Sequence, residues 1–247
     1  MSNTKAGPKH FLNDICVIRI ILILLLILYH SLCPYTSAFW DNPQGYDIPL
    51  YYWIGRLSYS CMLETFVLIS GVILGFQTKR NGREALSFTH LVVGKLKRLI
   101  IPSLLFGTIY FLIFMDLSSA PFTIVKSLFE GVGHMWFLPM LFWCFFFLFI
   151  ISILRLDRKE ILPLLLLFAI FSSLPLPLRM NQSMYYFFFF FLGYCIGTKQ
   201  IDISRFINRK TILVTSLIFI ITFPLLAHLR YDYDEIFIAN KMGGVLR

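Results

Sequence analysis

Residues 15–34 read ICVIRIILILLLILYHSLCP, a run of 20 residues in which Arg19 is the only charged side chain. A helix needs roughly 20 mostly apolar residues to cross the hydrocarbon core of a membrane. The apolar core of this run is longer than that of a cleaved signal peptide, and Arg19 stands near its start. The run is therefore predicted to be a retained transmembrane helix.

Six further apolar runs follow it, at about 57–76, 99–117, 136–154, 161–178, 185–198 and 211–228. The chain is 58% hydrophobic and 14% charged, whereas a soluble domain carries about 25% charged residues. Alternating strands of barrel type are absent, so the spans must satisfy their backbone groups as helices. These observations predict an all-α, polytopic transmembrane helix bundle with about seven spans. Residues 1–247 are expected to form one integral-membrane domain.

Positive charge alternates along the connections between these runs. The connections 77–98, 155–160 and 199–210 each hold several Lys or Arg residues, whereas the intervening ones hold one each. The positive-inside rule then places the N-terminus in the cytoplasm. We predict a multi-pass protein of the cell (inner) membrane whose net charge of +9 serves topology and contacts with anionic membrane lipids. Nucleic-acid binding is not expected, because no separate basic domain is present.

Two other features have structural explanations. The five cysteines are scattered, with no Cys-x-x-Cys pair, and are interpreted as small apolar residues in helices. No metal site is predicted. The aromatic run Phe187–Phe191 is interpreted as a lipid-facing or packed stripe.

Arg19 and His30 are polar residues within the first span, eleven residues apart. On a helix that spacing separates them by about 20° around the axis and roughly 16 Å along it. Either residue alone has a structural explanation: Arg19 can extend to the cytoplasmic headgroups, and His30 can be hydrogen-bonded near the outer interface. Together they form one polar edge, which favours a functional role. Histidine suits proton transfer near neutral pH, and arginine suits binding of an anionic group.

Other polar residues near the spans leave two interpretations open. Glu64, at the start of the second span, can form a structural ion pair or take part in chemistry. His134 and Trp136 fit an interfacial position, but the predicted topology puts His134 on the same outer side as His30. Lys95, Lys97 and Arg98 precede the third span, where they can be a topological signal or bind phosphates.

Five short motifs, taken in order across about 19–197, resemble the acyltransferase type 3 family of membrane-bound O-acyltransferases that modify bacterial sugars. They are Arg19 followed after ten residues by His30, Glu64-Thr-Phe-Val-Leu-Ile-Ser-Gly71, Lys97-Arg-Leu99 leading to Pro102, His134-Met-Trp-Phe-Leu138 and Phe191-Leu-Gly193. The family typically has more spans than the seven visible here. The resemblance therefore implies a truncated member, incomplete at its C-terminus.

The resemblance implies transfer of an acyl group, most often acetyl, from acetyl-CoA to a hydroxyl of a cell-surface or lipid-linked carbohydrate. Acetyl-CoA is then a donor substrate, and no bound cofactor is expected. On this basis we assign site residues by role: His30, Arg19 and Glu64 to catalysis; Arg19, Lys97 and Arg98 to the donor; His134, Trp136 and Ser70 to positioning the acceptor.

Two alternatives remain at this level. One is a transporter or flippase subunit for lipid-linked saccharides, which should show helices interrupted by Gly or Pro in matching halves. Pro163, Pro175, Pro177 and Pro224 do not form such a pair. The other is an inactive truncated remnant. Dependence on acetyl-CoA would separate the enzyme from the transporter.

Overall fold

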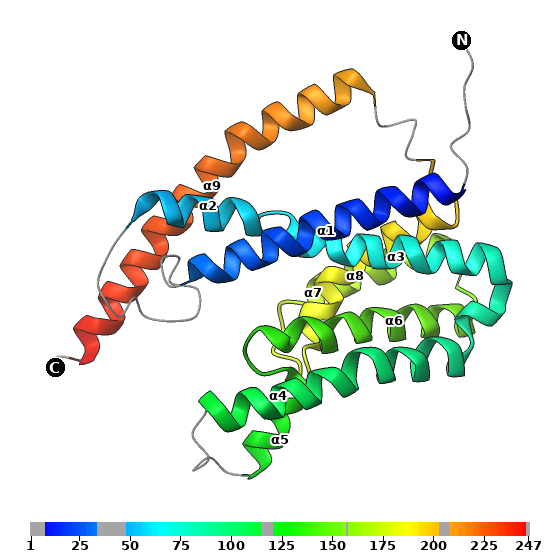
Figure 1. The fold of residues 1–247 in the computed structure, drawn as a ribbon, viewed down its shortest axis with the longest axis horizontal. Coiled ribbons are helices and arrows are strands. Elements are labelled where there is room, and N and C mark those ends of the chain that lie inside the picture. Colours follow the sequence, from blue (N-terminus) through cyan, green and yellow to red (C-terminus); the bar gives the residue numbers. More distant parts are fainter. Residues whose placement is uncertain (1–7, 34–47, 115–120, 157, 203–207, 246–247) are drawn as a thin grey trace. The chain divides into compact units, whose positions relative to one another are not determined.

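The computed structural model describes residues 8–33, 48–114, 121–156, 158–202 and 208–245, and within them every regular element is a helix (Figure 1). This confirms the predicted all-α class. In chain order the elements are α1 (Pro8–Leu32), α2 (Pro49–Tyr59), α3 (Met62–Asn81), η2 (Gly82–Leu86), η3 (Phe88–Val93), η4 (Leu96–Ile100), α4 (Ile101–Phe114), α5 (Pro121–Glu130), η5 (Gly133–Trp136), α6 (Phe137–Leu154), α7 (Arg158–Phe171), α8 (Met180–Gly197) and α9 (Arg209–Val245).

Five helical stretches of the described residues are long and apolar enough to cross a membrane. They are Asn13–Leu32, Pro49–Leu86, Phe88–Ile113, Phe137–Leu154 and Arg209–Leu226, and each contains or overlaps a predicted span. The protein is therefore a membrane protein with several apolar helices. The exact number of spans and the side of the N-terminus stay predictions.

The other two predicted spans coincide with α7 and α8. Helix α7 has 14 residues, about 21 Å of helix, which is shorter than the hydrocarbon core of about 30 Å. It ends at Phe171 and not near residue 178; the following segment contains Pro175 and Pro177, which lack a backbone N–H and disfavour helical geometry in the residues before them. Helix α8 has 18 residues and packs inside the protein along one face.

The chain divides into two compact units. Unit 1 comprises residues 1–27 and 59–201, and unit 2 comprises residues 28–58 and 202–247. In unit 2, α2 and α9 meet through Trp53 and Phe223, whose ring centroids are 6.3 Å apart in an edge-to-face arrangement. Unit 1 holds the other helices from α3 to α8 and most of α1.

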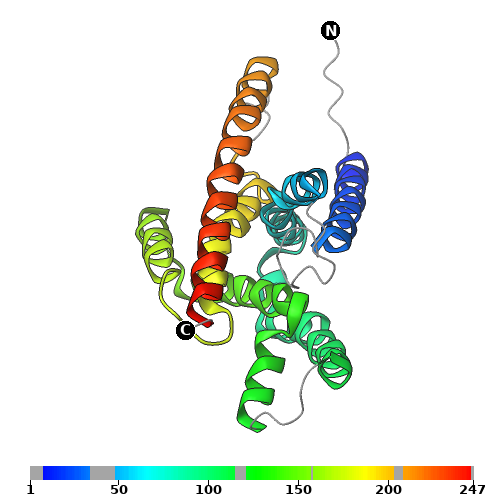
Figure 2. The ribbon, with the colours of Figure 1, turned by 90° about the vertical axis from the view of Figure 1, so that its left-hand side faces the viewer.

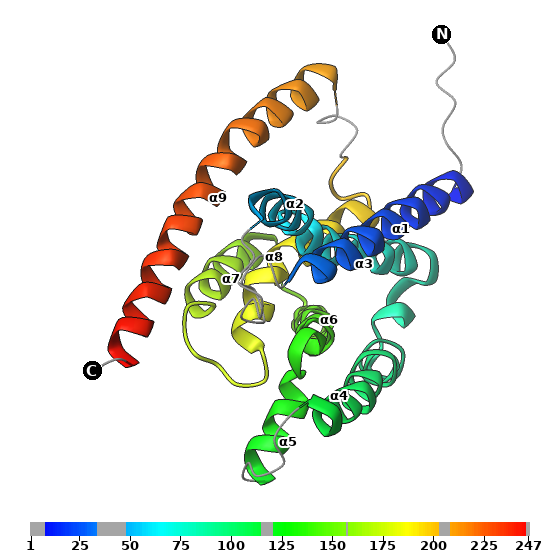
Figure 3. The same ribbon diagram turned by 60° about the vertical axis from the view of Figure 1, so that its left-hand side comes forward.

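Helices α3 and α8 form the centre of unit 1. Figures 2 and 3 show α7 beside α8 on one side, α1 beside α3 on the other, and α6 beneath the central pair. Two buried residues of α1, Ile15 and Leu22, share an apolar cluster with Met62, Ile69 and Val72. Helix α1 is thereby packed on α3 through the face that carries Ile15 and Leu22, while other apolar residues of α1, such as Ile20 and Leu24, are exposed.

The contact between α3 and α8 depends on four glycines at matching positions. Gly71 and Gly75 on α3 face Gly193 and Gly197 on α8, so that each helix presents a small residue every four positions. A Cβ at any of the four would meet the backbone of the facing helix; at Gly75 it would lie 2.5 Å from the carbonyl oxygen of Tyr194. Such small-residue pairs let membrane helices approach closely and gain van der Waals contact.

The aromatic run of α8 is both packed and exposed, depending on the face of the helix. Phe187 and Phe190 are fully buried, whereas Phe188 is 52% exposed. Phe145 of α6 contacts Phe190 edge to face, with centroids 4.8 Å apart, and Phe147 contacts Phe187 in the same way. Lipid tails are as apolar as these rings, so close packing and not exclusion from water stabilises this core.

Candidate active site

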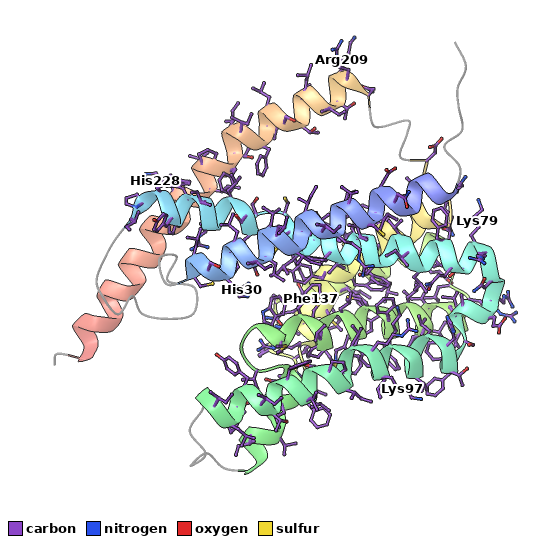
Figure 4. The ribbon with its side chains drawn as sticks, in the orientation of Figure 1. His30, Lys79, Lys97, Phe137, Arg209 and His228 are labelled. Carbon is purple, nitrogen blue, oxygen red and sulfur yellow. The ribbon has the colours of Figure 1, made fainter. Side chains whose placement is uncertain are left out.

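Unit 1 has two chemically different ends. Figure 4 shows Lys79 and Lys97 toward one end of the unit and Phe137 toward the other. We call the first the basic end, and α3, α6 and α8 finish there. The cations that these helices and the segments beside them bring to it include Lys79, Arg80, Arg83, Lys95, Lys97, Arg98, Arg155 and Lys199. The opposite end, where α3 and α8 begin, contains α5 and η5.

A cationic cluster forms at the basic end from residues of two distant segments. Arg19 of α1 and Arg98 of η4 both lie close enough to Lys95 for their charges to act on it. The Lys95 side chain is half-buried, and its Nζ lies 4.1 Å from the centroid of the Phe145 ring. The ring face carries partial negative charge, which helps to hold a cation there. Three neighbouring positive charges repel one another, so an anion is the natural ligand.

The segment that carries Lys95 and Arg98 departs from α-helical geometry. Residues Phe88–Val93 and Leu96–Ile100 form π-helical turns within a helical stretch that continues to Ile113. The basic residues predicted to precede the third span therefore lie inside this stretch. Wider helical turns of this kind are frequent at functional sites.

A pocket of about 690 Å³ opens elsewhere on the basic end. The polar residues that line this pocket include Arg83, Arg155, Ser152 and Gln200, and most of the other lining residues are apolar. Arg155 follows α6 with a left-handed backbone, φ 50°. This pocket adds a second place where cations meet apolar surface at the same end.

At the opposite end, a carboxylate, a phenol and an indole come together. Glu64 lies half-buried in the first turn of α3, within electrostatic range of the Tyr186 hydroxyl on α8. The Trp136 ring lies 6.3 Å from the Tyr186 ring, centroid to centroid. Tyr59 is also within electrostatic range of Tyr186. A carboxylate and a phenol beside an aromatic ring can accept, donate and stack against a polar ligand.

The turn before η5 determines where Trp136 lies. Gly131 has φ 83°, a left-handed conformation that favours glycine, and a Cβ there would lie 2.6 Å from the backbone nitrogen of Trp136. Only glycine fits this close approach without moving the backbone. The Trp136 backbone is thus fixed against the end of α5.

The family model described as an acyltransferase domain matches residues 12–245, nearly the whole chain. The chain belongs to the acyltransferase 3 family. No curated protein and no solved structure matches the chain. Membership of the acyltransferase 3 family supports acyl transfer by a membrane protein, with carbohydrates as the general class of acceptor.

The structure brings together some of the predicted site residues of this acyltransferase 3 chain. Arg19 and Arg98 both lie within electrostatic range of Lys95, whereas Lys97 is exposed. Glu64 and Trp136 both neighbour Tyr186. These positions leave the assigned roles as predictions.

Three other predicted residues have a different setting. His30 belongs to unit 2, where its ring meets the Tyr29 ring edge to face at 5.4 Å. His134 lies in η5, but its side chain is outside the described part of the chain. The Ser70 hydroxyl donates to the Phe66 carbonyl at 2.9 Å, a bond within its own helix. Among the described residues, no group of three His, Cys, Asp or Glu side chains can hold a metal ion.

The sequence analysis named Lys95 in a basic run that can bind phosphates but assigned only Lys97 and Arg98 to the site, and it did not single out Tyr186. Lys95 was visible in the basic run, but spacing alone did not distinguish it from its neighbour Lys97. Tyr186 stands at the edge of an aromatic run whose bulk is core. The local sequence gives one sign that Tyr186 lies near polar residues: Gln182 precedes it by four residues, so the two share a face of α8.

Proposed function

We propose that this protein transfers an acyl group, most often acetyl, from acyl-CoA to a hydroxyl of a cell-surface or lipid-linked carbohydrate. The observation that carries the proposal is the match of the acyltransferase family model across residues 12–245. The cationic cluster of Arg19, Lys95 and Arg98 supports it, because three cations at one end of a membrane protein suit the phosphates of a soluble donor.

In this proposal, α1 carries two roles. Arg19, with Lys95 and Arg98 and with Lys97 nearby in sequence, binds the donor phosphates. His30, eleven residues later on the same continuous helix, accepts the proton of the acceptor hydroxyl as its oxygen attacks the thioester carbonyl. The carbon–sulfur bond then breaks, the carbonyl carbon keeps the new ester bond, and the thiolate of CoA takes up the proton that His30 accepted.

The remaining residues act on the acceptor. Glu64 and Tyr186 bind hydroxyls of the acceptor by hydrogen bonds, and Trp136 stacks against the sugar ring. His134 is assigned to the same task from its motif. The acceptor thus approaches from the opposite end and the donor from the basic end.

The proposal is tested by the O-acetyl content of surface polysaccharide, measured by NMR in otherwise identical strains. The strains carry no gene, the native chain, His30→Ala or His90→Ala; His90 is an exposed histidine in η3 and serves as the matched control. Native chain and His90→Ala should restore the acetyl signal, and His30→Ala should not. Equal signal from both variants would remove His30 from the mechanism.

A second measurement tests the donor. Membranes that contain the chain should move labelled acetyl from acetyl-CoA to de-O-acetylated polysaccharide, and omission of acetyl-CoA should stop the reaction. A transporter would not need the donor. Absence of any acetyl-CoA-dependent product with the native chain would refute the proposed activity for this chain.

A further inference from the structure

A small pocket of about 340 Å³ lies at the opposite end of unit 1, between α5 and the start of α8. Its polar lining comes from Lys126 and Glu130 of α5 and from Arg179, Asn181 and Gln182 around the start of α8. The segment 175–177, Pro-Leu-Pro, forms an apolar wall. The volume is near the lower limit of ordinary ligand sites, which suits a ligand of sugar size and not a nucleotide.

Glu130 holds the two sides of this pocket together. Its carboxylate oxygen Oε1 accepts a bond from the backbone nitrogen of Leu178 at 3.3 Å, and its backbone carbonyl accepts one from Arg179 Nε at 3.1 Å. Lys126 Nζ lies 3.9 Å from the same Oε1. The bond from Arg179 is to a neutral carbonyl, so the guanidinium charge is not neutralised by it.

The backbone at this point adopts an unfavourable conformation. Leu178 and Arg179 are consecutive non-glycine residues with left-handed backbones, φ 56° and 62°. Side chains with a Cβ rarely adopt this region, and such residues concentrate at functional sites where neighbouring contacts hold them. Here the two bonds to Glu130 supply those contacts.

Gln182 supplies a second, independent observation. Its side-chain oxygen Oε1 is buried and has no hydrogen-bond partner among the described residues, although Gln182 lines the pocket. A buried polar atom without a partner is costly, and it marks a place where a ligand can provide the missing donor. Gln182 also precedes Tyr186 by four residues, on the same face of α8.

We propose that this pocket is the subsite that binds the saccharide acceptor, with Gln182 Oε1 accepting a bond from a sugar hydroxyl. The inference rests on the proposed function. Sugar hydroxyls both donate and accept hydrogen bonds, and the lining offers both kinds of group: Lys126, Arg179 and Asn181 donate, whereas Glu130, Asn181 and Gln182 accept. The face that runs from Gln182 to Tyr186 leads toward the group formed by Glu64 and Trp136.

Other ligand classes fit this lining less well. A phosphate group would approach Lys126 and Arg179 but would also meet the Glu130 carboxylate, which lies 3.9 Å from Lys126 Nζ. A purely apolar ligand would leave the Gln182 oxygen without a partner. A lining of mixed donors and acceptors, in which one carboxylate accompanies two cations, favours a hydroxyl-rich ligand.

The test measures binding directly on the purified full chain. The probe is the repeat-unit oligosaccharide of the host's own surface polysaccharide, with its acetyl groups removed by mild base, and binding is followed by saturation-transfer NMR. Gln182→Leu removes the side-chain oxygen at similar volume. Gln77→Leu makes the same exchange at an exposed site on α3 and serves as the matched control.

We expect Gln182→Leu to bind the oligosaccharide about 5-fold more weakly, the effect of one lost neutral hydrogen bond, and Gln77→Leu to bind like the native chain. Thermal unfolding should show that Gln182→Leu is at least as stable as the native chain, because it loses an unsatisfied polar atom. A purely structural glutamine would instead show lower stability with unchanged affinity.

Unchanged binding by Gln182→Leu, or no binding by the native chain, would overturn the subsite. These results are distinguishable from failure of the proposed function. Binding without acetyl-CoA-dependent transfer would refute the activity and leave the subsite supported. Transfer that Gln182→Leu leaves unaltered, with unchanged acceptor KM, would refute the subsite and leave the activity supported.

Discussion

The two ends of unit 1 use charge in opposite ways. At the basic end, Arg19, Lys95 and Arg98 gather with like sign, and the Phe145 ring face is the partner found for Lys95. At the opposite end, Glu130 lies between Lys126 and the 178–179 backbone and satisfies groups on both sides. A cluster of one sign attracts an anion by its field, whereas a hydrogen-bonded pocket of mixed charge recognises a ligand by geometry. The comparison suits a phosphate-bearing donor at one end and a neutral saccharide at the other.

The largest effect is expected at the contact between α3 and α8, because both helices run from one end of unit 1 to the other. Gly71→Leu places a side chain against the backbone of α8. We therefore expect the native structure of both ends to be disrupted together and the free energy of unfolding to fall by about 3 kcal/mol or more. Thermal unfolding of the purified protein measures it. Gly94→Ala is the control, because its nearest neighbour would be 3.8 Å away. A Gly71→Leu protein as stable as the native chain would show that the stability of unit 1 does not depend on the close contact between α3 and α8.

The next prediction separates two neighbouring lysines at the basic end. Lys95→Met should raise the KM for acyl-CoA about 10- to 100-fold, since a charge-assisted contact of about 1.5–3 kcal/mol is lost. Lys97→Met should have a smaller effect, because Lys97 is exposed and its charge is screened by solvent. Steady-state kinetics with varied acyl-CoA measure both. An equal rise for the two variants would contradict the assignment of Lys95 to the cluster.

Salt concentration should change the KM for acyl-CoA more than the KM for the saccharide. Between about 0.1 M and 1 M salt the Debye length falls from about 10 Å to about 3 Å, which weakens attraction between exposed cations and phosphates. Arg19 and Arg98 are exposed, so the KM for acyl-CoA should rise several-fold while the KM for the saccharide changes little. If salt raised both KM values alike, the proposed division of charge between the ends would be wrong.

The smallest effect is expected for Ser70. Its hydroxyl already donates to the Phe66 carbonyl within α3, so Ser70→Ala should change acceptor KM less than 2-fold and stability by about 1 kcal/mol at most. Acceptor kinetics and thermal unfolding measure these quantities. A large rise in acceptor KM would support the original assignment of Ser70 to the acceptor.

The all-α membrane class could be predicted from residues 15–34 and the runs that follow, because hydropathy and helix length are local properties. The family could also be predicted, because its motifs are short and ordered along the chain, and the match over residues 12–245 confirmed it. Span length was less predictable. Helix α7 ends at Phe171, where the following Ser and Pro residues interrupt an otherwise apolar run.

The residues that contact the site residues could not be predicted from the sequence, because these contacts depend on which helices pack together. Lys95 and Lys97 are equivalent in composition, and only the packing of η4 against α6 puts Lys95 over Phe145. The same holds for Glu64 and Tyr186, more than a hundred residues apart, which meet because facing glycines bring α3 against α8. Hydropathy and charge pattern therefore determined the class and the chemistry available, while close packing between distant helices selected the side chains that share a site.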